Sequence, residues 1–312
     1  MSRNVRIAAV QLPAWSEGDT PAARYQYRCQ AALYWLKQAG EAGADLVCLG
    51  ETCTGEEVIE DAYTNSFTQQ AAALAVQYQM NVILPIAGLV EGVRRNVALV
   101  IDRSGTIAGH YLKVHPTRRE MSDGAVPGDN FPVFNLDFGC VGVAICHDLS
   151  FPESTRVLAL RGAEILVWPT WWSGWGEELC YAVIRSRAID NGAWLVTASF
   201  GIQDEKAWRP GMVLGRSGVI APDGLILSNA GRYVGMAITE IDLDKPRLAH
   251  AFSFGDEGDF WTSVLADRRP DAYGAITDPD FVIPAVPPAE RSLLAVRGQI
   301  PLASTPTSEP VA

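Results

Sequence analysis

Three polar residues stand directly after apolar runs of the sequence. Glu51 ends ADLVCLGE, Lys113 ends TIAGHYLK and Cys146 ends VGVAIC. If these runs are strands of shared sheets, the three side chains can meet at one edge, because open α/β sheets bind ligands at the carboxyl ends of their strands. A thiol becomes a nucleophile when a base takes its proton, and a carboxylate can be that base. A lysine ammonium, like the backbone N–H after the nucleophile, can then stabilise an oxyanion.

Each of these residues taken alone also has a structural explanation. A free cysteine is usually a small buried apolar residue. A glutamate can cap a helix or lie on the surface, and a lysine at the end of a strand is usually solvated. The spacing therefore leaves two interpretations open: an enzyme of acyl transfer and a non-catalytic α/β binding protein.

Composition excludes several other classes of protein. The chain has 312 residues and a net charge of −11, whereas nucleic acid and anionic membranes are bound by clustered Lys and Arg. No run of roughly 18 apolar residues could span a bilayer, and the N-terminal MSRNVRIAAVQLPAW has no signal-peptide pattern. We therefore expect a cytoplasmic protein with no nucleic-acid and no membrane partner.

Motifs for cofactors and metals are absent from the sequence. There is no Gly-rich phosphate loop, no GxSxG and no HExxH, and the six cysteines and four histidines show no zinc-site spacing. We therefore expect no metal and no cofactor, with the chemistry carried by side chains and the cysteines present as thiols.

Strand-like and helix-like segments alternate along most of the chain. Short Val/Ile/Leu-rich runs predict strands, and an apolar spacing of three or four predicts helices. The predicted strands are 6–11, 44–49, 82–87, 97–101, 106–112, 141–145, 164–170, 193–199, 212–220, 225–228 and 236–241. The predicted helices are 22–43, 66–79, 153–161 and 177–192. This alternation, with hairpin turns at 102–105 and 222–224, predicts an α/β fold with mixed sheets.

We find no repeat and no linker before residue 285. The sequence therefore predicts one domain, residues 1–285, followed by a C-terminal extension, residues 286–312. The end of this extension, LASTPTSEPVA, is rich in Pro, Ser and Thr, which is typical of a disordered segment or of one that lies at an oligomer interface.

Seven segments together resemble the nitrilase superfamily of carbon–nitrogen hydrolases, from about residue 5 to about residue 275. They are RIAAVQ, LGETCTG, YLKVHPTRRE, ICHDLSFPESTRVLALRGAEILVWPT, RSRAIDNGAWLVTAS, GRSGVIAPDG and RRPDAYG, and they stand in the order of the family. The resemblance implies a four-layer αββα sandwich with two mixed β-sheets, which pairs into homodimers or larger homo-oligomers.

The resemblance also implies roles for individual residues. Cys146 would be the nucleophile, Glu51 the general base and Lys113 the stabiliser of the oxyanion. Glu120 matches a second glutamate that many members use to position the substrate or support the lysine. The backbone N–H of His147 would complete the oxyanion hole.

Two positions depart from the pattern of the family. Gly50 stands where the family usually has proline, and the segment after Glu51 is one residue shorter than usual. His147 replaces an aromatic residue, and its imidazole could tune the thiolate, contact the substrate or point into solvent. Asp148, next to it, is expected to order the turn by accepting hydrogen bonds from backbone N–H groups.

The motifs point to two branches of the superfamily. KVHPTRRE is similar to the lysine segment of true nitrilases, whereas CHDLSFPE is similar to the cysteine turn of amidases and N-carbamoyl amide hydrolases. Because the turn shapes the pocket of the nucleophile, we expect hydrolysis of a small amide or N-carbamoyl compound through a cysteine thioester, with release of ammonia or amine. Conversion of a nitrile to a carboxylic acid and ammonia is the alternative, and a non-catalytic binding protein on the same fold is a third.

Two loops could border the pocket. Trp171, Trp172 and Trp175 could form an aromatic wall, or could instead fill the core or a dimer interface. Arg209 lies on another loop, where a guanidinium could hold a substrate carboxylate in a bidentate pair.

Overall fold

The computed structural model of the chain describes residues 2–171, 176–203, 214–245 and 265–278. The chain divides into two compact units, Met1–Ala266 and Asp267–Ala312. The described part of the second unit contains one 3-10 turn, Pro270–Ala272, and the short helix α6, Gly274–Thr277. The predicted domain boundary at 285 and the predicted extension 286–312 lie outside the described residues.

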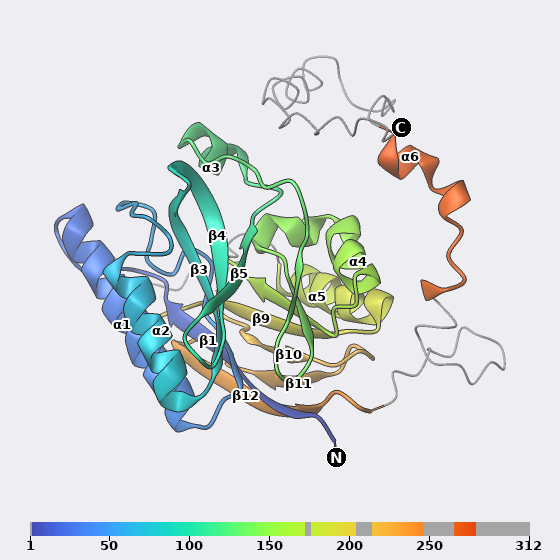
Figure 1. The fold of residues 1–312 in the computed structure, drawn as a ribbon, viewed down its shortest axis with the longest axis horizontal. Coiled ribbons are helices and arrows are strands. Elements are labelled where there is room, and N and C mark those ends of the chain that lie inside the picture. Colours follow the sequence, from blue (N-terminus) through green and yellow to red (C-terminus); the bar gives the residue numbers. More distant parts are fainter. Residues whose placement is uncertain (1, 172–175, 204–213, 246–264, 279–312) are drawn as a thin grey trace, which may run out of the picture. The chain divides into compact units, whose positions relative to one another are not determined.

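The first unit contains twelve strands among its described residues (Figure 1). They are β1 (Asn4–Pro13), β2 (Leu46–Cys48), β3 (Asn81–Val90), β4 (Val93–Ile101), β5 (Ile107–Leu112), β6 (Val133–Asn135), β7 (Cys140–Val143), β8 (Ile165–Pro169), β9 (Trp194–Gly201), β10 (Gly218–Ile220), β11 (Ile226–Asn229) and β12 (Gly235–Asp242). The helices are α1 (Pro21–Glu41), α2 (Ser66–Tyr78), α3 (Arg118–Ser122), α4 (Pro152–Leu160) and α5 (Glu177–Asn191), with a 3-10 turn η1 at Cys146–Ser150.

The strands form one connected mixed sheet, in which nine lie in the order β5-β4-β3-β2-β1-β9-β8-β7-β6. Of the other three, β10 pairs with β9 and β11, and β12 pairs with β1. The central pairs β1–β2, β2–β3, β7–β8 and β8–β9 are parallel, while β3–β4, β4–β5 and β6–β7 are antiparallel. The predicted α/β class with mixed strand pairing is therefore confirmed. The two halves are joined where Gln11–Pro13 pairs in parallel with Ser199–Gly201, so they are one sheet by hydrogen bonding rather than two separate ones.

Alternation along the strands divides the buried side chains into three apolar clusters. In β1, Ala8, Val10 and Leu12 face α1 and α2, whereas Val5, Ile7 and Ala9 belong to a second cluster made by strands of both halves. In β8 the residues of one face enter that second cluster and those of the other face pack against α4 and α5. The two pairs of helices thus cover different strands of the sheet (Figure 1).

One predicted strand is much shorter than expected. Residues 212 and 213 lie outside the described part of the chain, and only Gly218–Ile220 of the rest is a strand. Gly215 and Arg216 have positive φ angles of 95° and 69°, which no strand residue adopts. A Cβ at Gly215 would lie 2.2 Å from the carbonyl oxygen of Gly231, so this close approach requires glycine.

Gln11 supports the junction of β1 with its neighbours. Its side chain is fully buried, donates to the carbonyl oxygens of Gly231 and Tyr233, and accepts from Ser217 N. We expect Gln11→Leu to lower the free energy of unfolding by about 2–4 kcal/mol, because it removes three hydrogen bonds and leaves the buried Ser217 N–H without its acceptor. Urea unfolding measures the change. The control Gln70→Leu, at an exposed position of α2, should change it by less than about 0.5 kcal/mol; an equally small loss at Gln11 would contradict this prediction.

Candidate active site

Cys146 begins a 3-10 turn three residues after the end of β7. Its φ angle is 44°, a left-handed conformation that is uncommon for residues other than glycine and persists only where the surroundings enforce it. Part of that enforcement comes from Trp168, whose Nε1 donates to the Cys146 carbonyl oxygen at 2.9 Å. The turn thereby places Cys146 beyond the end of β7, where it packs against the second apolar cluster and also lines a cavity.

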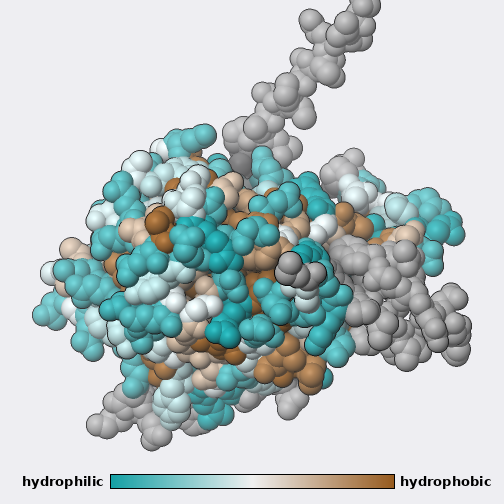
Figure 2. Space-filling view, turned by 60° about the horizontal axis from the view of Figure 1, so that its bottom comes forward, coloured by the Kyte–Doolittle hydropathy of each residue, from teal (hydrophilic) through white to brown (hydrophobic). Residues whose placement is uncertain are grey.

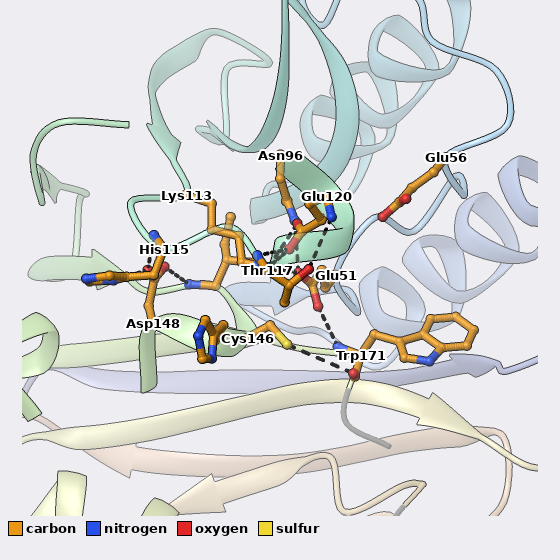
Figure 3. Close-up of polar contacts among 12 residues, drawn as sticks. Glu51, Glu56, Asn96, Lys113, His115, Thr117, Glu120, Cys146, Asp148 and Trp171 are labelled. Atoms are coloured by element: carbon orange, nitrogen blue, oxygen red, sulfur yellow. Dashed lines mark hydrogen bonds and ion pairs between the residues drawn. The ribbon is translucent and has the colours of Figure 1, made fainter. Parts of the chain in front are cut away.

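Asp148 connects this turn to the end of β5. Its fully buried carboxylate accepts from Ile145 N at 2.8 Å and from the Tyr111 hydroxyl at 2.6 Å. It also accepts from His115 N at 2.9 Å (Figure 3). The expectation that Asp148 orders the turn through backbone N–H groups is confirmed. The same carboxylate holds the residues on both sides of Lys113, so the positions of Cys146 and Lys113 are coupled.

Lys113 follows β5 directly and its side chain is 1% exposed. The ammonium Nζ donates to Glu51 Oε1 at 2.6 Å and to Glu120 Oε2 and Oε1 at 2.8 and 3.0 Å. Both glutamates are buried, Glu51 after β2 and Glu120 in the first turn of α3. The predicted residues Glu51, Lys113 and Glu120 therefore form one hydrogen-bonded cluster (Figure 3).

Burial and charge shift the pKa values of this cluster in opposite directions. Burial disfavours the charge on Lys113, but the carboxylates of Glu51 and Glu120 outweigh it and raise the pKa of the ammonium. Burial likewise opposes the charge of Glu120, yet Lys113 lowers the pKa of that carboxyl below its usual value. The Lys113 ammonium and the Glu120 carboxylate are therefore both charged at neutral pH.

The environment of Cys146, in contrast, favours the neutral thiol over the thiolate. Burial raises the pKa of this thiol, the Glu51 carboxylate raises it further, and Lys113 lowers it by a smaller amount. The resting group is consequently a thiol beside a carboxylate. His147 is also affected, since burial and then the charge of Lys113 lower the pKa of its imidazole, which favours the neutral ring.

Two further residues of the cluster do not follow from the sequence. Asn96, in β4, is buried, and its Nδ2 donates to Glu51 Oε1 at 2.9 Å and to Glu120 Oε1 at 2.7 Å. Thr117 forms a capping box with Glu120: its N donates to Glu120 Oε2 at 2.7 Å, and its hydroxyl accepts from Glu120 N. These contacts fix both carboxylates independently of Lys113. The one signal for Asn96 is its place directly before the predicted strand 97–101, in the strand β4 that pairs with β5.

Trp171 links the base to the thiol. Its backbone N donates to Glu51 Oε2 at 2.8 Å, and its carbonyl oxygen lies 3.9 Å from Cys146 Sγ. The two segments that carry Glu51 and Cys146 are thus joined by one residue, which lies two positions after the end of β8 (Figure 3). Gly50 fits here because a Cβ would lie 2.8 Å from the Phe200 ring and 2.9 Å from the Ser199 carbonyl oxygen.

A cavity of about 540 Å³ opens over the cluster. Its lining includes Glu51, Lys113, Glu120 and Cys146 together with Trp171, so it brings these five predicted residues to one site. The predicted pocket residues Trp172, Trp175 and Arg209 lie outside the described residues. The face of the molecule in Figure 2 is mainly hydrophilic, with small apolar areas between the polar ones.

The part of the chain that the structure describes contains no cluster of three metal-ligating side chains. Within the same residues, no helix combines the length and the apolar character needed to cross a bilayer. All six cysteines are free thiols.

Comparison with known proteins defines the class. Residues 6–250 match the family model of carbon-nitrogen hydrolases, so the chain belongs to the carbon-nitrogen hydrolase family, and the predicted membership of the nitrilase superfamily is confirmed. The chain is 33% identical over 254 residues to a nitrilase of Pyrococcus abyssi, covering 76% of this chain and 89% of that protein. It is 30% identical over 242 residues to a deaminated glutathione amidase of Synechocystis, covering 69% and 86%.

Solved structures show the same fold. The carbon-nitrogen hydrolase of Helicobacter pylori G27 superimposes with a TM-score of 0.70 at 24% identity, covering 88% of this chain and 98% of that one. An amidase from Nesterenkonia sp. gives a TM-score of 0.67 at 22% identity, covering 88% and 96%. Family membership therefore makes this chain a carbon–nitrogen hydrolase of amides or nitriles, on the fold of that superfamily.

The charge of Lys113 should determine how stability depends on pH. In the wild type Lys113 lowers the pKa of Glu120, so its stabilisation is present above the ordinary glutamate pKa of about 4.3 and is lost as the pH falls below it. We expect Lys113→Met to lower the free energy of unfolding at pH 7 by about 3–5 kcal/mol, because two buried carboxylates lose their cation. Without Lys113, burial raises the pKa of the Glu120 carboxyl, so the variant should become more stable as the pH falls from 7 towards about 5.

Chemical unfolding across this pH range measures both effects. Lys37→Met is the matched control, since Lys37 pairs with Glu41 on the exposed surface of α1. Its pH profile should follow that of the wild type. Parallel profiles for Lys113→Met and the wild type would contradict the electrostatic account of the cluster.

Proposed function

We propose that this protein hydrolyses a small amide or N-carbamoyl compound through a thioester at Cys146. The observation that carries the proposal is that the Cys146 thiol opens into the same cavity as the buried cluster of Glu51, Lys113 and Glu120. A nucleophile, a base and a fixed positive charge are the three parts that acyl transfer requires. An amidase from Nesterenkonia with this fold is known with the acetamide moiety of fluoroacetamide added at its active-site cysteine, which supports the assignment.

In the acylation step Glu51 takes the proton of the Cys146 thiol while Sγ attacks the carbonyl carbon. The carbonyl oxygen becomes an oxyanion, which Lys113 Nζ and the backbone N–H of His147 stabilise. The oxyanion then reforms the carbonyl, the carbon–nitrogen bond breaks, and Glu51 returns the proton to the leaving ammonia or amine. This leaves an acyl thioester on Cys146.

In the second step Glu51 takes a proton from a water molecule, which attacks the thioester carbonyl. The same donors stabilise the oxyanion, and the thiolate leaves and recovers its proton from Glu51. Glu51 serves twice because Asn96 Nδ2, Lys113 Nζ and Trp171 N hold it in one position. Glu120 and Asn96 keep Lys113 charged and in place.

A nitrile is the second candidate substrate. Attack of the thiol on a nitrile carbon gives a thioimidate, which water converts to the same thioester with loss of ammonia. Two relatives of this chain, from Pyrococcus abyssi and Schizosaccharomyces pombe, are named nitrilase and probable nitrilase, which keeps this alternative open. The amide remains our first choice because the cysteine turn CHDLSFPE resembles that of amidases.

We also propose the finer architecture that the family implies. The three apolar clusters would be the interfaces of a four-layer αββα sandwich, because α1 and α2 contribute to the first, strands to the second, and α4 and α5 to the third. Residues 1–285 would form the catalytic domain of a homodimer or larger homo-oligomer. The six free thiols suit a reducing, cytoplasmic location.

Ammonia release from simple amides, N-carbamoyl amino acids and nitriles tests the function. We expect the wild type to turn over one of these panels and Cys146→Ala, shown to be folded by circular dichroism, to lose at least about 10³-fold in kcat. The active panel identifies the branch. Equal rates for both proteins would contradict the role of Cys146.

Glu51 raises the pKa of the Cys146 thiol and, in the proposed mechanism, accepts its proton. These two effects can be measured separately. Because the Glu51 carboxylate raises the pKa of Cys146, Glu51→Gln should lower that pKa and move the pH profile of iodoacetamide alkylation to lower pH. The same variant should hydrolyse amides about 10²- to 10⁴-fold more slowly, because no base takes the proton. Glu41→Gln, at the exposed end of α1, is the control for both assays. Proportional losses of alkylation and hydrolysis in Glu51→Gln would instead indicate a purely structural role.

A further inference from the structure

Arg28 on α1 brings a second positive charge to the cavity that contains Cys146. Its guanidinium carbon lies 5.3 Å from the centre of the Trp171 ring and 6.0 Å from that of Phe200. On another side Gly55 lets the side chain approach the backbone closely, since a Cβ there would lie 3.0 Å from Arg28 Cδ and 3.2 Å from its Nε. Position 55 favours glycine because of this close contact and because its φ angle is 81°. The guanidinium is therefore held in one place by its neighbours.

The charge of Arg28 meets the rings of Trp171 and Phe200 and, at longer range, the Glu57 carboxylate, but it has no hydrogen-bonded partner among the described residues. Its Nε is buried and has no hydrogen-bond partner, and no described carboxylate forms an ion pair with it. Stacking on the aromatic rings leaves the N–H groups of a guanidinium available in its plane. A partly buried cation without a hydrogen-bonded partner is costly unless a ligand completes it.

The carboxylates that line the same cavity have cations of their own. Glu57 pairs with Arg24 at 2.8 Å, and Glu56 lies 4.0 Å from Arg94. Glu51 and Glu120 share Lys113. Arg119 also lines the cavity, but its side chain is 89% exposed, so water and salt screen it. Among the described residues, Arg28 is consequently the cavity cation best placed to bind an anion from a ligand.

Trp171 sets the position of this cation relative to the thiol. Its carbonyl oxygen lies 3.9 Å from Cys146 Sγ, while its indole extends away from the Lys113 cluster (Figure 3). The guanidinium of Arg28 lies over this indole. A substrate whose carbonyl carbon is at Sγ would therefore place the far end of its acyl group along the indole. That end would meet the guanidinium.

We infer that Arg28 binds a carboxylate at the far end of the substrate, so that this hydrolase prefers amides or N-carbamoyl compounds that carry a terminal carboxylate. This inference rests on the proposed function. A guanidinium matches a carboxylate with two parallel hydrogen bonds, which neither an amide nor an alkyl group reproduces. Arg28 comes from a different part of the chain than Arg209, for which the sequence suggests a similar contact.

The test compares substrates that differ in charge and not in shape. Succinamate is paired with 4-methylpentanamide, and N-carbamoyl-β-alanine with (3-methylbutyl)urea, so that an isopropyl group replaces the carboxylate in each pair. We expect wild-type kcat/KM to favour the carboxylate in the pair that is turned over. Arg28→Met should lower kcat/KM for the charged substrate by about 10- to 100-fold and leave the neutral one within about threefold.

Two variants control for charge and for hydrogen-bond geometry. Lys37→Met removes one positive charge from the exposed face of the same helix and should leave the preference unchanged. Arg28→Lys keeps the charge but loses the planar pair of donors, so its preference should fall between those of wild type and Arg28→Met. Circular dichroism confirms that each variant is folded.

A binding measurement separates this inference from the proposed function. Calorimetric titration of succinate into Cys146→Ala should give a dissociation constant at least about tenfold lower than in Cys146→Ala with Arg28→Met. If no panel is hydrolysed, the proposed function fails, and this titration alone decides whether Arg28 binds a carboxylate. Equal affinities of the two proteins for succinate, or an equal loss of both members of a substrate pair in Arg28→Met, would overturn the inference.

Discussion

The buried ammonium of Lys113 is the interaction on which the site depends. A charge that is 1% exposed is tolerated only if oppositely charged and hydrogen-bonded partners surround it. Glu51 and Glu120 supply the charges, and Asn96 fixes both carboxylates through one amide nitrogen. Removing any one member leaves the others buried and incompletely paired. The elements that carry them, β2, β4, β5 and the turn into α3, are therefore held in a single arrangement at this edge of the sheet.

The second constraint is that this cluster must face the thiol. Asp148 accomplishes this through backbone hydrogen bonds to both segments, and Trp171 through contacts with Glu51 and Cys146. The thiol pKa is raised by burial and by Glu51, so the resting site holds its proton next to the group that can accept it. The contacts that position Cys146 next to Glu51 are therefore also the contacts that allow the proton of the thiol to pass to Glu51.

Much of this arrangement could be predicted from the sequence because it follows from strand ends. Glu51, Lys113 and Cys146 each follow an apolar run, and parallel central strands bring such ends to one edge. The turn at 102–105 correctly predicts the β4–β5 hairpin. Asn96 was within reach of the same argument, since Lys113 N donates to its carbonyl oxygen across that hairpin. The predicted strand, 97–101, does not include it because this strand starts four residues later than β4, which begins at Val93.

Other features depend on contacts between distant parts of the chain. The stacking of Arg28 on Trp171, the close approach of Gly215 to Gly231 and the junction of β1 with β9 have no local signal in the sequence.

The central claim is that Cys146 carries the acyl group during turnover. Its most direct test is mass spectrometry of the intact protein, acid-quenched during turnover of the amide or N-carbamoyl compound that is hydrolysed, followed by peptide mapping. The account predicts a mass increase equal to the acyl group on the peptide that contains Cys146. Turnover without an adduct, in Glu51→Gln as well as in the wild type, or an adduct on another residue, would contradict it.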